Sequence, residues 1–210
     1  MNPCYLSHFI EESTPVYGGV KKTISLNQIS SIKNGDTANS KKICFPNHVG
    51  THIDFPNHFG NDGKKCLDYP ASFWIFNKVG FLDCSIDEVP DKILMLPKDI
   101  ELLILKTGFG ENRNKEIYWS SQPVIPASFA LLFRNAFPNL RVFGFDMISL
   151  TSKLNRVEGK KAHIAFLLDQ DILILEDMNI DNLFVSPQKV IISPLQIGAL
   201  DGAPCTVIAF

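Results

Sequence analysis

The chain has 210 residues, of which 45% are hydrophobic and 20% are charged, and its formal net charge is −2. This composition is typical of a soluble globular protein, and the length suits a single domain, residues 1–210, with a substantial core. The low net charge and the lack of basic runs argue against nucleic acid and anionic membranes as partners. No segment approaches the roughly 18 apolar residues that a membrane span requires.

The five cysteines are scattered along the chain and never occur in Cys-x-x-Cys spacing. Such a pattern is typical of reduced thiols and not of a disulfide framework or a zinc ribbon. The first residues also lack the apolar core of a signal peptide, so we predict a cytoplasmic location. Cys44 precedes His48 by four residues, but a small buried hydrophobe is a more common role for cysteine than one near a metal.

The first part of the chain predicts short strands separated by turns. Residues 4–10 are apolar and indicate a strand, and residues 13–19 contain the proline and paired glycines of a turn. Residues 20–47 alternate weakly between polar and apolar side chains. They include Asn34-Gly35, a strong hairpin signal, so we expect strands that lead into the segment that follows.

Residues 48–58 are the most informative stretch of the chain. Three of the five histidines fall here with one aspartate, all at even positions: His48, His52, Asp54 and His58. Imidazole and carboxylate are the usual ligands of zinc and manganese. On a straight strand, at about 3.3 Å per residue, the first and last histidine would lie roughly 33 Å apart and could not share an ion. We therefore expect the chain to fold back, most readily at Gly50 and Pro56.

The middle of the chain indicates further strands after a polar turn at 61–65. Residues 73–83, 93–96 and 102–107 have the pattern of strands or short apolar segments, and the last is almost continuously apolar, as a strand buried on both faces would be. The Gly-Phe-Gly that follows at 108–110 lacks the lysine and the flanks of a nucleotide-binding loop, so we expect a tight turn.

The second half alternates between helix and strand. Residues 126–137 predict a helix with proline in its first turn, and 160–169 predict a second helix. Residues 141–146 and 171–176 indicate strands that end in Asp146 and Glu176. The last expected elements are a strand at 190–194, a turn at 201–204 and a final strand. This alternation predicts a single-domain mixed α/β fold.

The stretch 48–58 resembles the signature of the metal-dependent cyclase family, which includes bacterial kynurenine formamidases and isatin hydrolases. The family pattern His-x-Gly-Thr-His-x-Asp-x-Pro-x-His is matched without a gap. Ala162-His163 and the Ile-Leu-Glu at 174–176 are similar to the family's downstream pair, and the likeness extends over nearly the whole chain. The resemblance implies the family's swivelling β/β/α arrangement and a homodimer or larger homo-oligomer.

The resemblance also implies a pair of divalent ions, zinc or manganese. Three residues would hold one ion: His48, His52 and Asp54. Asp54 and Glu176 would bridge to a second ion, which His163 would complete. His58 would be the general acid/base. Tyr17 would line the substrate pocket, although Gly18, Gly19 and Val20 replace the Pro-Gly-Asp of the family there and leave the substrate open.

Asp146 has two interpretations. The family has a similar Gly-x-Asp segment with a serine shortly after it, here Ser149, so Asp146 could orient a ligand residue. A lone aspartate at the end of a strand more often caps a turn.

These residues lead to one main hypothesis and two alternatives. The main one is a metal-dependent hydrolase of a small aromatic amide, an arylformamidase that converts N-formylkynurenine and water to kynurenine and formate. The first alternative is a hydrolase of isatin or another cyclic amide, or a cyclase of the same family. The second is a non-catalytic protein with a structural metal. The chain has no Gly-x-Ser-x-Gly elbow, which argues against a serine hydrolase.

Overall fold

One mixed sheet of nine strands organises residues 2–210, the part of the chain that this computed structural model describes. Its strands are β1 Cys4–Tyr5, β4 His52–Asp54, β5 Ile75–Phe76, β6 Val79–Asp83, β7 Leu102–Lys106, β8 Val142–Phe145, β9 Leu173–Glu176, β10 Val190–Pro194 and β11 Gly202–Ala209. The order across the sheet is β5-β10-β11-β4-β9-β8-β7-β6, and β1 also pairs with β11. Strands β6 to β9 are parallel, whereas β4 is antiparallel to both of its neighbours.

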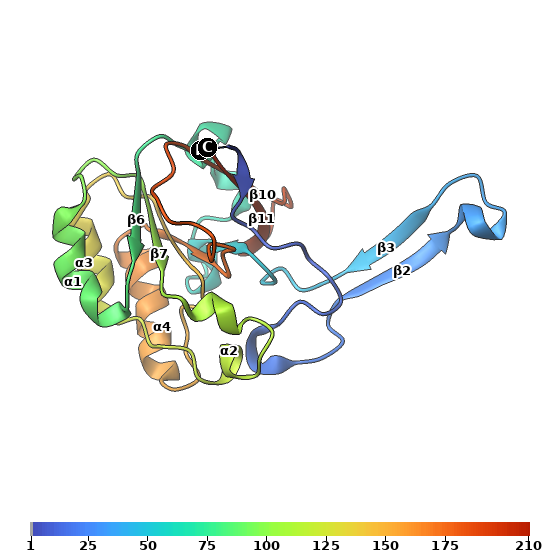
Figure 1. Cartoon of the computed structure of the whole chain (residues 1–210), viewed down its shortest axis with the longest axis horizontal. Coiled ribbons are helices and arrows are strands. Elements are labelled where there is room, and N and C mark those ends of the chain that lie inside the picture. Colours follow the sequence, from blue (N-terminus) through green and yellow to red (C-terminus); the bar gives the residue numbers. More distant parts are fainter. Residues whose placement is uncertain (1) are drawn as a thin grey trace.

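The parallel half of the sheet is covered by helices. They are α1 Val89–Lys92, α3 Ser128–Ala136 and α4 Arg156–Ile164, whereas α2 Ile117–Ser120 contacts the 3-10 segments Tyr17–Gly19 and Phe109–Asn112. In Figure 1, α1, α3 and α4 lie to one side of β6 and β7. Phe133 of α3 meets Phe143 of β8 edge-on, with ring centroids 5.0 Å apart, and Phe166 stacks on the same ring at 5.4 Å. No helix among residues 2–210 combines the length and the apolar character needed to cross a membrane.

The sheet curls until its two edges nearly meet. Strands β5 and β6 stand at opposite ends of the strand order, yet only residues 77–78 separate them in the chain. Arg141, just before β8, reaches across this seam and donates hydrogen bonds to the backbone carbonyls of Phe73 and Ile75. The mixed α/β fold that the sequence predicts is confirmed, in the form of a barrel-like sheet.

Three local predictions differ from the structure. Residues 93–96 are not a strand, because Ser85 and Glu88 form a capping box that starts a helical segment, and Ile93–Met95 ends it as a 3-10 helix. Only Cys4–Tyr5 of the first predicted strand is extended within a named strand. The predicted turn at 201–204 belongs mostly to β11, where Gly202 pairs with Asp54.

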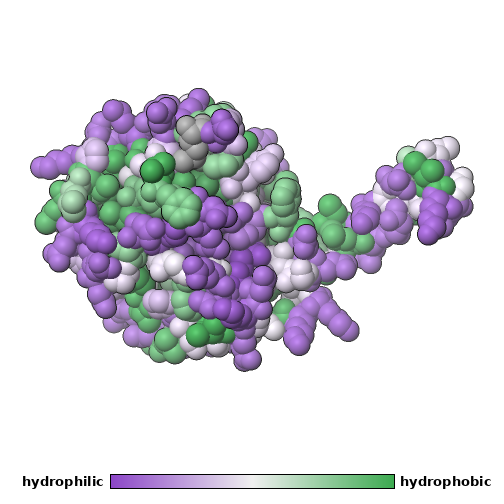
Figure 2. Space-filling view, viewed as in Figure 1, coloured by the Kyte–Doolittle hydropathy of each residue, from purple (hydrophilic) through white to green (hydrophobic). Residues whose placement is uncertain are grey.

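Strands β2 Ser25–Ser30 and β3 Ser40–Cys44 form a separate two-stranded sheet, which confirms the predicted hairpin. Gly35, with φ of +96°, closes the turn in the left-handed region. Figures 1 and 2 show this hairpin projecting from the body as an arm, with both hydrophilic and hydrophobic surface. Ile29, Ile32 and Ile43 are all more than half exposed on it.

Candidate metal centre

The segment 48–58 folds back at both residues that the sequence indicates. Gly50 takes a φ of +61°, which favours glycine, and Pro56 starts the 3-10 helix Pro56–His58. Between them β4 runs through the middle of the sheet. Thr51 anchors the turn, because its hydroxyl donates to the carbonyl of Asp177 and accepts from the backbone N–H of His8. The segment is thus held so that its four polar side chains converge.

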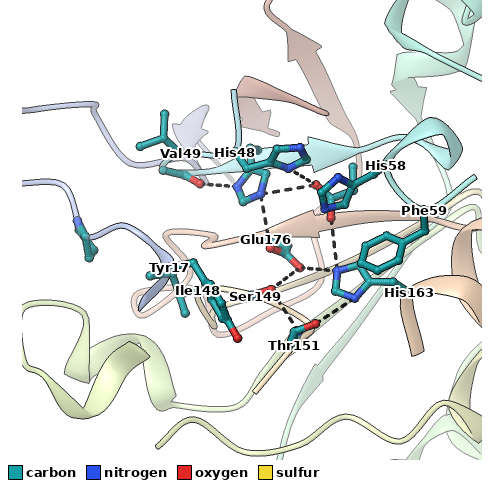
Figure 3. Close-up of a pocket in the computed structure, with 14 residues that line it drawn as sticks. Tyr17, His48, Val49, His58, Phe59, Ile148, Ser149, Thr151, His163 and Glu176 are labelled. Carbon is teal, nitrogen blue, oxygen red and sulfur yellow. Dashed lines mark hydrogen bonds and ion pairs between the residues drawn. The ribbon is translucent and has the colours of Figure 1, made fainter. Parts of the chain in front are cut away.

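The second half of the site comes from β9 and α4. Strand β9 pairs with β4 so that His52 stands opposite Glu176, and α4 carries His163 on its buried side. All seven residues predicted for the site line one cavity of about 310 Å³: Tyr17, His48, His52, Asp54, His58, His163 and Glu176. Figure 3 shows how these side chains converge on the cavity beside Phe59 and Ile148.

Two carboxylates lie between the histidines. Asp54 Oδ1 is 2.8 Å from His48 Nδ1 and 3.5 Å from His52 Nε2, while its Oδ2 is 3.5 Å from His163 Nε2. Glu176 Oε2 is 3.4 Å from His52 Nε2, and its Oε1 is 3.6 Å from His163 Nε2. Each carboxylate therefore faces imidazoles with both of its oxygens.

Backbone carbonyls determine which nitrogen of two imidazoles faces the carboxylates. His52 Nδ1 lies 2.8 Å from the carbonyl oxygen of Gly50, and His163 Nδ1 lies 2.8 Å from that of Gly159. A carbonyl can only accept, so Nδ1 carries the hydrogen in both rings. In the neutral imidazole, the lone pair on Nε2 then points at carboxylate oxygens, and two acceptors face one another. Such an arrangement is stable only with a cation between them, either a proton or a metal ion.

The close approach of imidazoles and carboxylates also shifts the pKa values of these groups. Burial lowers the pKa of His52, but the hydrogen bond to Glu176 and the charge of Asp54 outweigh it and raise the pKa to about 9. Burial likewise lowers the pKa of His163, and Asp54 and Glu176 raise it to about 10. Burial raises the pKa of Asp54, yet the surrounding imidazoles hold it well below its usual value. The metal-free cavity therefore retains protons at neutral pH.

The donor set fits a divalent cation. Imidazole nitrogens and carboxylate oxygens are the donors that zinc and manganese share, and the ligand atoms form two sets, in each of which they lie within 4.8 Å of one another. These sets are His48 with Asp54 and His58, and His52 with Asp54 and Glu176. The second set is fully buried, so an ion there would be shielded from bulk water.

His58 has a partner that the sequence analysis missed. Its Nδ1 lies 2.8 Å from Asp201 Oδ2, and the same oxygen lies 3.2 Å from His48 Nε2. Burial raises the pKa of Asp201, but these hydrogen bonds outweigh it and hold the pKa below its usual value. Gly202, next in the chain, leaves room for the ring, because an added Cβ would stand 2.2 Å from His48 Cε1.

Other sequence-based candidates have distinct places. Tyr17 lines the cavity, and its buried hydroxyl has no hydrogen-bond partner among residues 2–210. Ser149 donates to Glu176. Asp146 does not line the cavity and accepts hydrogen bonds from the loop 107–110. Of its two interpretations, the structure therefore supports the one in which it caps a turn. Cys44 is exposed on the hairpin and does not line the cavity.

Comparison with known proteins identifies the family of this chain. The sequence pattern of the Cyclase family, described as putative cyclase, matches residues 4–151, which is more than half of the chain. The chain belongs to the Cyclase family. A kynurenine formamidase from Bacillus mycoides (strain KBAB4) is 29% identical to this cyclase-family chain over 177 residues, which cover 83% of the chain and 81% of the relative.

Solved structures share the fold of this cyclase-family chain. Isatin hydrolase A from Labrenzia aggregata superposes with a TM-score of 0.81 at 21% identity, covering 99% of the chain and 93% of that protein. A protein from Bacillus stearothermophilus, described as a predicted metal-dependent hydrolase, gives a TM-score of 0.75 at 16% identity and covers 97% of its own length and 99% of the chain. The cyclase-like fold expected from the sequence is confirmed, and the proteins it resembles include a kynurenine formamidase and an isatin hydrolase.

Proposed function

We propose that this chain is a metal-dependent arylformamidase that hydrolyses N-formylkynurenine to kynurenine and formate. The observation that carries the proposal is the pairing of acceptors inside the cavity, where the Nε2 atoms of His52 and His163 face the oxygens of Asp54 and Glu176. The kynurenine formamidase of Bacillus mycoides, at 29% identity, supports the reaction type.

Two divalent ions, zinc or manganese, are part of the proposal. His48 and His52 would hold one ion with Asp54, and His163 would hold the other with Glu176 and the second oxygen of Asp54. Metal bound there supplies a water of lowered pKa and polarises the amide carbonyl. All of these donors line the cavity, which supports chemistry at a point that a substrate can reach.

The remaining steps belong to side chains of the cavity. His58 borders the cavity, and only its Nδ1 is engaged by a hydrogen bond within residues 2–210, so Nε2 can take a proton from water as the C–O bond forms. The same nitrogen returns that proton to the amine as the C–N bond breaks. Tyr17 offers its unpartnered hydroxyl to a polar group of the substrate, and Phe59 offers an apolar wall.

A chelation experiment tests this proposal. Protein stripped with a chelator should lose activity on N-formylkynurenine and formanilide, and zinc or manganese should restore it. Protein that was never stripped serves as the reference, and stripped protein supplemented with magnesium serves as the control for non-specific ion effects. Metal-loaded protein that hydrolyses neither a formanilide nor a small lactam would contradict the proposal.

A second substrate class is supported by the lining of the cavity. No lysine or arginine among the described residues lines it, so neither of these side chains is there to pair with the carboxylate of an amino acid such as formylkynurenine. A neutral lactam such as isatin needs no such partner, and an isatin hydrolase shares the fold with a TM-score of 0.81. The ratio of kcat/KM for isatin to that for N-formylkynurenine separates the two classes.

We also propose a cytoplasmic homo-oligomer. The exposed isoleucines of the β2–β3 arm support self-association, because an isolated two-stranded hairpin is marginally stable in water and gains from being covered. Unpaired thiols at Cys66, Cys84 and Cys205 support a reducing compartment. Sedimentation equilibrium tests the assembly, and a monomer at all concentrations would contradict it.

A further inference from the structure

Asp201 occupies an unusual position beside the cavity. One of its oxygens, Oδ2, lies 2.8 Å from His58 Nδ1 and 3.2 Å from His48 Nε2. The other oxygen, Oδ1, accepts a hydrogen bond of 2.7 Å from Asn47 Nδ2. Its backbone carbonyl accepts from the N–H of Phe55 at 2.9 Å. The backbone and the side chain of Asp201 are therefore both held by hydrogen bonds other than those to the two imidazoles.

We propose that Asp201 is a positioning residue that sets the tautomer and orientation of His58 and His48, a role that rests on the proposed function. A carboxylate accepts and does not donate, so the ring nitrogens that face it must carry hydrogen. His58 then has its hydrogen on Nδ1 and its lone pair on Nε2. His48 faces a carboxylate with each nitrogen, so the metal-free ring carries hydrogen on both. A metal ion bound at Nδ1 would displace the hydrogen that lies toward Asp54 Oδ1, 2.8 Å away, and would leave the hydrogen on Nε2.

This assignment gives each ring one task. His48 turns Nδ1 toward the side of the cavity where the other donors converge, and an outer carboxylate on the opposite nitrogen is the usual support of a ligand histidine. His58 uses Nε2 as the base that removes a proton from the attacking water. The resulting imidazolium donates through Nδ1 to Asp201 until Nε2 returns the proton to the departing amine, and the residue ends in its starting form.

Asp201 is accessible enough to be replaced without damaging the core. Its side chain is 35% exposed, whereas Asp54 is 1% exposed, so neither an empty volume nor an unpaired buried charge follows from its loss. A loss of function in its variants can therefore be separated from unfolding by a thermal melt. Asp62, on an exposed turn with no hydrogen bond or ion pair among the described residues, offers the matched control Asp62→Asn.

Histidine side-chain NMR on zinc-loaded protein tests the positioning directly and needs no substrate. We expect exchange-protected imidazole N–H signals from His58 Nδ1 and His48 Nε2, assigned with His58→Ala and His48→Ala. Both signals should disappear or exchange rapidly in Asp201→Ala and persist in Asp62→Asn. Signals that survive in Asp201→Ala would overturn the proposal.

Kinetics test the consequence. When both proteins are saturated with zinc, Asp201→Ala should lower kcat about 10- to 100-fold with KM nearly unchanged, and Asp201→Asn should recover part of the loss, because its amide oxygen can still accept from one ring. The loss should be smaller for N-formyl-4-nitroaniline than for formanilide, since a better leaving group needs less proton donation. Asn47→Ala, which frees one side of Asp201, should cost less than Asp201→Ala.

The possible failures are distinct. Full recovery of kcat in Asp201→Ala at saturating zinc would limit Asp201 to a role in metal binding and overturn the positioning of His58. An unchanged kcat in both Asp201 variants would also overturn it, while the proposed function would stand. If metal-loaded wild-type protein hydrolyses no amide, the proposed function fails, and the NMR signals still decide whether Asp201 positions the two rings.

Discussion

A proton and a metal ion compete for the same atoms in His52 and His163. Each ring gives its Nδ1 hydrogen to a backbone carbonyl, so Nε2 is the one nitrogen left for either cation. The pKa values, raised to about 9 and about 10, mean that both rings hold a proton in the metal-free protein at neutral pH. Metal binding must displace these protons.

The affinity of the metal-free protein for zinc should therefore fall as the pH falls. Below the raised pKa values each displaced proton costs about tenfold in affinity per pH unit, and above them the dependence levels off. Chelator competition at about pH 6.5 and about pH 8 measures the slope, and calorimetry in two buffers of different ionisation enthalpy counts the protons released. Affinity that does not change over this range would contradict the assignment.

His58→Ala tests whether His58 is the proposed general acid/base and not a ligand. General acid/base groups contribute about 10²- to 10⁴-fold to a rate, so kcat should fall by that factor while zinc content stays near that of the wild type. His52→Ala is the comparison, since it removes a buried donor and should lower zinc content and activity together. Equal loss of metal and activity in His58→Ala would instead make His58 a ligand, and it would favour the non-catalytic alternative.

Gly202 of strand β11 lets the backbone lie close to His48. The backbone of Gly202 lies against the ring of His48, so a methyl group there would force the ring out of place. We expect Gly202→Ala to weaken zinc binding and activity about 10- to 100-fold, as loss of ligand support typically does. Gly198→Ala, whose added Cβ would come no closer than 3.3 Å to Leu67, is the control and should leave both unchanged.

The sequence predicts the elements that carry their own signals. The density of histidines at 48–58, with Gly50 and Pro56 as the fold-back points, was enough to predict the turn, and the helix-strand alternation predicted α4 and β9. Asp201 had no such signal. It lies 153 residues from His48 in sequence, and a lone Asp-Gly reads as a turn until its strand is paired. Only the pairing of β11 with β4 brings the two residues together.

The β2–β3 arm is a separate part of the molecule from the barrel-like sheet. Its two strands pair with each other and with no other strand among residues 2–210. Replacing residues 28–41 with Asn-Gly should keep the circular dichroism spectrum and zinc content of the body, because the arm adds little to the core. The same variant should sediment as a smaller assembly. A loss of zinc would contradict this independence of arm and site.

The place of β4 in the sheet has a consequence for how the protein matures. This strand is flanked by β9 and β11, so it finds its pairing partners, with Glu176 opposite His52, only in strands that come much later in the sequence. Because β9 follows β4 only after β5 to β8, the donors of the two strands cannot meet until translation, at about 5–20 residues per second, has passed Glu176. A divalent ion would thus be acquired only after β9 has been synthesised, and a product that ends before β9 lacks Glu176.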